Sequence, residues 1–224
     1  MSIVPDGLAK TTRGGIAPIA RRLHALGVSA NAVTLVGFLI TVAGATLLAL
    51  GQPGAGLVVL LLGTLSDTLD GQIARAAGGG TRFGAFLDST LDRLSDAALA
   101  IAAVWIGAST LTVFDLFFVH KIVPLPVVLG TADILFWGGL LLLVSSFLVS
   151  YIRAKAESLG EGATVGLAPR EARIAIYLIG VAAWAVSGNP QLFAAAVALA
   201  AFLATVTVLQ RIAHMASALD EKKG

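Results

Sequence analysis

The chain has 224 residues, of which 57% are hydrophobic and 12% are charged, and its mean hydropathy is +0.91. Soluble domains typically carry about 25% charged residues, so this composition excludes an ordinary soluble protein and indicates an integral membrane protein. The net charge of +2, with no basic run, excludes a nucleic-acid-binding surface, and the lack of cysteine excludes disulfides and thiolate metal sites.

The N-terminal segment, residues 1–30, is polar and basic, and it lacks the continuous apolar core and small-residue cleavage site of a signal peptide. Residues 8–27 mix apolar residues with basic ones, and the segment from Ile16 on has the character of a helix with two unlike faces. This pattern predicts an amphipathic helix that lies on the membrane surface.

Six apolar stretches follow, and each is close to the roughly 20 residues that cross a bilayer as a helix. The predicted spans are residues 32–50, 55–76, 84–107, 132–155, 171–187 and 191–214. The short connections at 51–54 and 188–190 contain Gly and Pro, as tight helical hairpins do, whereas residues 108–131 form a longer, partly hydrophobic loop. We therefore expect an all-α integral membrane protein with six transmembrane helices and an N-terminal amphipathic surface helix.

The basic residues predict the orientation of these spans. Of the 15 Lys and Arg residues, all except Lys121 fall at the termini, in the 77–83 and 156–170 loops, or at the adjoining helix ends. The positive-inside rule makes that side cytoplasmic, so both termini are expected inside a multi-pass protein of the inner (plasma) membrane. Three parts result: a cytoplasmic segment with the surface helix (1–30), a six-helix domain (31–215) and a cytoplasmic tail (216–224).

Four aspartates lie within these apolar stretches. A carboxylate inside a membrane helix costs a few kcal/mol or more, so four close together indicate a shared function. Asp67 and Asp70 share one face of a helix, and Asp88 and Asp92 lie one turn apart on the next. Hard oxygen ligands select Mg²⁺ or Mn²⁺, and four carboxylates suit two bridged ions better than one. The alternative, helix–helix hydrogen bonding, explains one such aspartate more readily than four.

Other residues around the acids suggest supporting roles. Gly71 and Gly84 lack side chains and would let a substrate or a helix approach the backbone. Arg75 lies just beyond the acidic face, where it would meet a phosphate or pair with an aspartate. Asp96 extends the acidic ladder by one turn and is expected to orient Arg93 or to cap a polar network rather than to bind metal.

The pattern Asp67-x2-Asp70-Gly71-x2-Ala74-Arg75-x8-Gly84-x3-Asp88-x3-Asp92 resembles the signature of the CDP-alcohol phosphotransferase family. The resemblance extends over the six helices and the surface helix. It implies an enzyme that displaces CMP from a CDP-linked lipid with a second alcohol, and it also implies a homodimer. The residues implied as ligands of two Mg²⁺ or Mn²⁺ ions are Asp67, Asp70, Asp88 and Asp92, with Asp92 also serving as general base. The residues implied in CDP binding are Asn31, Thr34, Asp67, Gly71, Ala74, Arg75 and Thr81.

The acceptor alcohol depends on other residues. The segments around residues 78–84, 150–157, 170–173 and 210–211 resemble the actinobacterial phosphatidylinositol-phosphate synthases, a subfamily in which three basic residues bind the phosphate of inositol 1-phosphate. By position these are Arg153, Arg173 and Arg211. Arginine suits bidentate phosphate recognition, although helix-end arginines also serve as interfacial anchors. The implied reaction converts CDP-diacylglycerol and inositol 1-phosphate into phosphatidylinositol phosphate and CMP.

Two alternatives remain open. A phosphatidylglycerophosphate synthase would use glycerol 3-phosphate, an acceptor that also carries a phosphate. A divalent-cation transporter would use the acids differently, but transporters commonly place their ligands between inverted repeats near the midplane, and the chain shows no repeat.

Overall fold

The computed structural model describes residues 18–110 and 130–221, and in these ranges the chain is helical, without strands. A short helical segment covers residues 18–25. The long helices are α2 (Ala30–Ala49), α3 (Pro53–Ala76), α4 (Arg82–Thr110), α6 (Thr131–Ser158), α7 (Arg170–Ser187) and α8 (Pro190–Glu221). The all-α prediction is confirmed. The start of the expected surface helix and the centre of the 108–131 loop lie outside the described residues.

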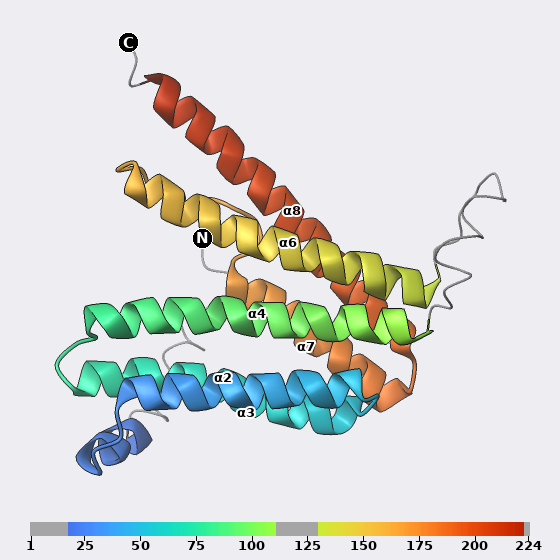
Figure 1. The fold of residues 1–224 in the computed structure, drawn as a ribbon, viewed down its shortest axis with the longest axis horizontal. Helices are drawn as coiled ribbons and strands as arrows, with labels where there is room; N and C mark the ends of the chain where they lie inside the picture. The colour runs from blue at the N-terminus through green and yellow to red at the C-terminus, as the bar shows by residue number, and fades with distance from the viewer. Residues whose placement is uncertain (1–17, 111–129, 222–224) are drawn as a thin grey trace.

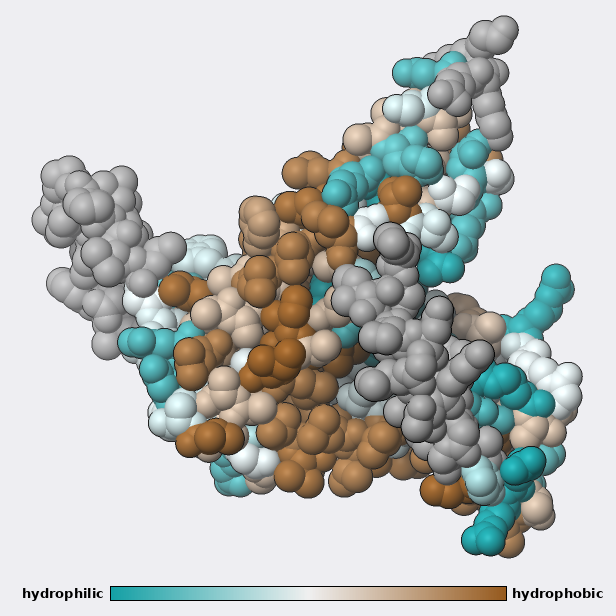
Figure 2. Space-filling view, turned by 180° about the vertical axis from the view of Figure 1, so that it is seen from behind, coloured by the Kyte–Doolittle hydropathy of each residue, from teal (hydrophilic) through white to brown (hydrophobic). Residues whose placement is uncertain are grey.

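Four of the described helices are long and apolar enough to cross a membrane: α2, α3, α6 and α8. This agrees with an integral membrane protein. Helix α4 is more polar because its first half carries the acidic ladder, and α7 has only 18 residues, three of which are charged. Figure 2 shows apolar side chains covering the middle of one face, with hydrophilic side chains gathered toward its ends.

The helices form two groups joined through α4 and α7. Helix α2 packs against both α3 and α4, and α4 also packs against α6, which packs against α8 (Figure 1). Helix α7 contacts α8 and α3. The Tyr177 hydroxyl donates a 2.7 Å hydrogen bond to the Leu99 carbonyl, and its ring lies edge-on to Phe193 at 5.0 Å. These contacts fasten α7 to α4 and α8 inside the largest apolar core.

A helix cap before α2 and a glycine turn between α3 and α4 set the positions of the helices that carry the aspartates. The Ser29 hydroxyl caps α2 by accepting from the Ala32 amide at 3.2 Å, so this helix begins two residues before its predicted start. Gly78 and Gly79 adopt positive φ angles of 88° and 128°, which suit glycine. This turn reverses the chain, and α4 begins at Arg82 beside the end of α3.

The C-terminal helix is the one element that departs clearly from prediction. Helix α8 ends at Glu221 rather than near 214, so most of the predicted 216–224 tail is helical. The prediction followed the apolar run, but a helix continues wherever its residues favour it and find packing. Met215 packs with Ala156 and Ala163, which supports this extension.

Helices α4 and α6 approach closely at Gly107. A Cβ atom there would lie 2.5 Å from the Phe136 amide nitrogen and 2.6 Å from the Ala132 carbonyl oxygen, which are backbone atoms that cannot turn aside. Gly107→Ala is therefore expected to destabilise the protein by about 1–3 kcal/mol, measured as a lower thermal unfolding temperature in detergent. The control is Gly54→Ala, since nothing lies within 4 Å of a Cβ atom at that helical position. Equal unfolding temperatures for the two variants would contradict the close α4–α6 contact.

Candidate active site

A cavity of about 450 Å³ lies among the start of α2, the end of α3 and the start of α4. Five of the residues predicted to bind CDP line it: Asn31, Thr34, Gly71, Ala74 and Thr81. Asp70 and Asp88 also reach its wall, as does His24 from the helical segment before α2. The cavity therefore combines a wall of small and hydroxyl-bearing residues with two carboxylates. The other two predicted CDP ligands, Asp67 and Arg75, are not among its lining residues.

Two glycines shape this cavity in different ways. A Cβ atom on Gly84 would lie 2.9 Å from the Asn31 side-chain oxygen, so glycine lets the Asn31 amide approach α4. At Gly71 a Cβ atom would meet only the Arg75 guanidinium, at 3.7 Å and beyond. The backbone at Gly71 is thus open toward the cavity, and the Arg75 side chain lies against the same turn of α3.

The four predicted metal ligands form one electrostatic cluster. Repulsion connects Asp70 with both Asp67 and Asp88, and it connects Asp92 with Asp67 and Asp88. Asp70 is buried, with 7% of its surface exposed, and its Oδ2 atom has no hydrogen-bond partner among the described residues. A buried anionic oxygen without a partner is costly, so this arrangement calls for a cation.

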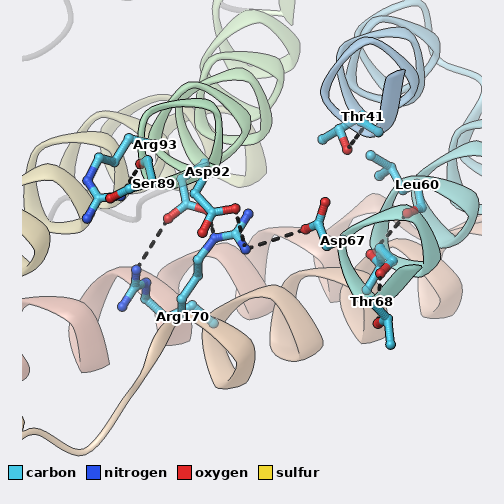
Figure 3. Close-up of polar contacts among 12 residues, drawn as sticks. Thr41, Leu60, Asp67, Thr68, Ser89, Asp92, Arg93 and Arg170 are labelled. Carbon is cyan, nitrogen blue, oxygen red and sulfur yellow. Dashed lines mark hydrogen bonds and ion pairs between the residues drawn. The ribbon is translucent and has the colours of Figure 1, made fainter. Parts of the chain in front are cut away.

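A positively charged side chain, that of Arg170, lies within this cluster of aspartates, as Figure 3 shows. The Arg170 guanidinium, at the first residue of α7, lies between Asp67 and Asp92. Its Nη1 atom is 3.0 Å from Asp92 Oδ1 and 3.5 Å from Asp67 Oδ2, and its Nε atom is 3.0 Å from Asp96 Oδ1. Arg170 therefore connects α7 to α3 and α4 at the level of the acids.

Of the two roles expected for Asp96, the structure shows a place in a polar network rather than the orientation of Arg93. Asp96 pairs instead with Arg170 and, at 3.4 Å, with Arg173 Nη2. Arg93 donates to the Ser89 carbonyl one turn back on its own helix. The start of α7 brings Arg170 and Arg173 to Asp96, a tertiary contact that spacing along α4 cannot reveal.

The three predicted acceptor-binding arginines come from the last turns of α6, the first turn of α7 and the C-terminal half of α8. Arg173 is buried and donates to the Ala168 carbonyl at 2.9 Å, and Arg211 is buried and donates to the Val165 carbonyl at 3.0 Å. Arg153 is about half exposed and pairs with Glu157 at 2.9 Å. Electrostatic repulsion connects Arg211 with both Arg153 and Arg173. A guanidinium has five N–H donors, so these contacts leave donors for an anion.

Side chains of α8 also hold the loop that precedes α7. Thr207 accepts from the Ala168 amide at 3.1 Å, and Gln210 accepts from the Leu167 amide at 3.0 Å. Because the loop leads directly into Arg170, these contacts set the position of the α7 arginines.

A family model described as CDP-alcohol phosphatidyltransferase matches residues 27–215. The chain belongs to this family. It is 38% identical over 164 residues to the phosphatidylinositol phosphate synthase of Mycobacterium tuberculosis strain H37Rv, covering 73% of this chain and 67% of the relative. It is 36% identical over 200 residues to the archaetidylinositol phosphate synthase of Methanothermobacter thermautotrophicus, covering 89% and 88%.

Solved structures agree with this membership. The M. tuberculosis phosphatidylinositol phosphate synthase in complex with manganese and citrate superposes with a TM-score of 0.73 at 34% identity, over 88% of this chain and 87% of that one. The same enzyme with CDP-DAG bound gives 0.72, over 88% and 91%. The resemblance seen in the aspartate signature is thereby confirmed at the level of family and fold.

The predicted metal ligands have the right chemistry for a divalent ion, but their side chains are not arranged around a common ion position in this structure. Among the residues that the structure describes, no three acidic, histidine or cysteine side chains are already arranged to hold a metal ion. The donor set is nevertheless appropriate, because it supplies hard carboxylate oxygens and the buried Asp70 Oδ2 lacks a partner. The obstacle is Arg170, whose guanidinium takes the oxygens of Asp67 and Asp92.

Arg170 is the site residue to which the sequence analysis assigned no role. Its place at a helix end favoured the usual role of interfacial anchoring. The sequence did hold a clue to the pairing of Arg170 with Asp96. Asp96 lies outside the motif and needs a cation, and Arg170 directly precedes a predicted helix that carries a second arginine three residues later.

Proposed function

We propose that the protein transfers the phosphatidyl group of CDP-diacylglycerol to inositol 1-phosphate, giving phosphatidylinositol phosphate and CMP. The observation that carries this proposal is the junction of the 450 Å³ cavity with the acid cluster through Asp70 and Asp88. The M. tuberculosis relative, which has CDP-DAG in one of its structures, supports the donor. The names of the bacterial and archaeal relatives support an inositol phosphate acceptor.

The donor half of the site would bind the nucleotide in the cavity. Asn31, Thr34 and Thr81 offer amide and hydroxyl groups, while Gly71 and Ala74 leave room for the substrate. Arg75, lying against Gly71, is placed to meet a phosphate. Asp67, Asp70, Asp88 and Asp92 would hold two Mg²⁺ or Mn²⁺ ions, which would neutralise the diphosphate and stabilise the departing CMP. The manganese in the M. tuberculosis structure supports this metal class.

The acceptor half would position the nucleophile. Arg153, Arg173 and Arg211 would bind the phosphate of inositol 1-phosphate and present a ring hydroxyl to the phosphatidyl phosphorus. The hydroxyl oxygen forms a new P–O bond, the P–O bond to CMP breaks, and the hydroxyl proton passes to the Asp92 carboxylate. Asp92 is placed for this because it is partly exposed at the edge of the cluster, beside the α7 arginines.

We also infer the membrane arrangement from helix length and charge. Helix α4 is about 43 Å long and α7 about 27 Å, so both approach or exceed the hydrocarbon thickness of about 30 Å. With the four apolar helices they make six spans, which form the 31–215 domain. The basic bias then puts the site and both termini on the cytoplasmic side of the plasma membrane, with the N-terminal helix on its surface. Homodimerisation is inferred from the family resemblance alone.

The deciding experiment measures CMP release from CDP-diacylglycerol and Mg²⁺ by the purified protein. Inositol 1-phosphate, free inositol and glycerol 3-phosphate are compared as acceptors. Release with inositol 1-phosphate alone is expected. CMP release with glycerol 3-phosphate alone would leave the proposed donor reaction in place and would identify the protein as a phosphatidylglycerophosphate synthase. No CMP release with any of the three acceptors would overturn the proposal. The distant alternative, a divalent-cation transporter, is already disfavoured by family membership.

The acceptor arginines make a testable contribution. Arg153→Gln is expected to raise the KM for inositol 1-phosphate by roughly tenfold, the effect of losing one charged, half-exposed hydrogen-bonding group. The KM for CDP-diacylglycerol should stay unchanged because Arg153 is not a lining residue of the donor cavity. Glu157→Gln is the control, since it removes only the partner of Arg153. An unchanged KM for inositol 1-phosphate in Arg153→Gln would remove that residue from the acceptor site.

A further inference from the structure

We propose that Arg170 is an exchangeable counter-ion: it neutralises Asp67 and Asp92 in the metal-free protein and yields both carboxylates when divalent ions bind. The freed guanidinium then joins the basic residues that receive the acceptor phosphate. The second step rests on the proposed function, whereas the first concerns the protein and the ions alone. Arg170 would be a positioning residue for the acids and a further acceptor-binding residue.

Competition follows from the atoms involved. Arg170 Nη1 contacts Asp92 Oδ1 at 3.0 Å and Asp67 Oδ2 at 3.5 Å, and both aspartates belong to the set that suits divalent ions. An ion bound to these oxygens would stand within a few ångströms of the guanidinium, and like charges at that distance repel strongly in a partly buried site. Arg170 and the ions therefore cannot hold the same carboxylates together.

The exchange is physically accessible because Arg170 is only moderately held. It is the first residue of α7, where the positive end of the helix macrodipole disfavours a cation, and Pro169 before it supplies no side-chain cap. Its side chain is 24% exposed, and the side chains of Asp67 and Asp92 are 37% and 27% exposed. A divalent ion carries twice the charge of the guanidinium and reaches these partly exposed carboxylates from solvent, so it can replace Arg170.

Asp96 determines where the displaced guanidinium goes. It accepts from Arg170 Nε at 3.0 Å, through an atom distinct from Nη1, and its other oxygen lies 3.4 Å from Arg173 Nη2. Asp96 is one turn beyond the predicted ligands, so ion binding leaves this anchor in place. Arg170 thus stays beside Arg173, with its Nη1 donors released toward the junction of the acid cluster and the acceptor arginines.

The test measures the Kd for Mn²⁺ by calorimetry on the full-length protein in detergent, without substrates. Arg170→Gln is expected to bind Mn²⁺ roughly tenfold more tightly than wild type, because the competing cation is gone. Its thermal unfolding temperature in EDTA should fall, since the acids lose their counter-ion. Arg93→Gln is the matched control: it removes the same charge next to Asp92, but its guanidinium contacts a backbone carbonyl, so its Kd should stay at the wild-type value.

An unchanged or weaker Mn²⁺ affinity in Arg170→Gln would overturn the exchange. If that variant does not fold, Arg170→Lys carries the test, because one ammonium cannot contact Asp96 and Asp92 as the fork of arginine does. It should tighten Mn²⁺ binding by a smaller factor, and a wild-type Kd would overturn the exchange.

The acceptor step is tested separately by the KM for inositol 1-phosphate, which should rise in the variant that folds. An unchanged KM would overturn that step. Since Mn²⁺ binding needs no substrate, a wild-type enzyme inactive with every acceptor would refute the proposed function and leave the exchange standing.

Discussion

Replacement of Asp70 by Asn is expected to reduce CMP release by at least a thousandfold while the protein remains folded. Asp70 is the most buried of the four acids, and its Oδ2 atom lacks a hydrogen-bond partner within the described ranges. An amide has nearly the same shape but no charge, so it cannot neutralise a divalent ion. A thousandfold loss corresponds to about 4 kcal/mol of transition-state stabilisation, a reasonable share for one ligand of a metal clamp.

The stability of the Asp70→Asn variant separates this explanation from misfolding. In EDTA the variant should unfold at the wild-type temperature or above it, because the substitution removes a buried charge that repels Asp67 and Asp88. Added Mn²⁺ should then raise its unfolding temperature less than it raises that of the wild type. Asp133→Asn provides the control, as it makes the same change at the far end of the bundle, where Asp133 caps α6. Activity within tenfold of wild type would exclude Asp70 as a metal ligand.

Asp92→Asn is expected to lower CMP release by about two to four orders of magnitude, the usual contribution of a general base. The amide cannot accept the proton of the attacking hydroxyl, yet the remaining acids and the donor cavity are intact. Stabilisation of the variant against heat by CDP and Mg²⁺ should therefore persist. Asp92 does not line the cavity, in contrast to Asp70 and Asp88, which agrees with a role on the acceptor side.

A contrasting variant sharpens the test of Asp92. Asp96→Asn changes a carboxylate one turn further along α4 that holds Arg170 and Arg173. Its main effect should be a raised KM for the acceptor rather than a lower kcat. Normal turnover by Asp92→Asn would refute the general-base role, and loss of CDP-dependent stabilisation would make Asp92 chiefly a metal ligand.

The fold and the donor side were largely predictable from the sequence. Apolar runs of bilayer length, bounded by Gly and Pro, mark the helices to within three residues everywhere except at the end of α8. The spacing of the aspartates on two consecutive helices indicated that they would meet, and the electrostatic coupling of Asp70 to Asp67 and Asp88 is consistent with this. Such features are local or follow from one helical hairpin, where short connections leave few arrangements.

Contacts between distant segments were not predictable in the same way. Asp67 and Arg170 are 103 residues apart in the chain, and their approach depends on how α7 crosses α3 and α4. Arg75, expected to meet a phosphate or to pair with an aspartate, lies against Gly71 on its own helix, while Arg170 lies between Asp67 and Asp92. Periodicity gives the face of a helix but not its neighbour, so Arg93 was the only partner of Asp96 that the sequence suggested by name.

The order of these parts along the chain has an evolutionary consequence. Every residue lining the donor cavity lies between His24 and Asp88, whereas the acceptor arginines and the loop that supports them lie between Arg153 and Arg211. The two regions are therefore separable by one recombination event in the α4–α6 connection. With the proposed roles, an exchange at this point would join the nucleotide site of one family member to the acceptor arginines of another, provided that the residues at positions 96 and 170 remain a compatible pair.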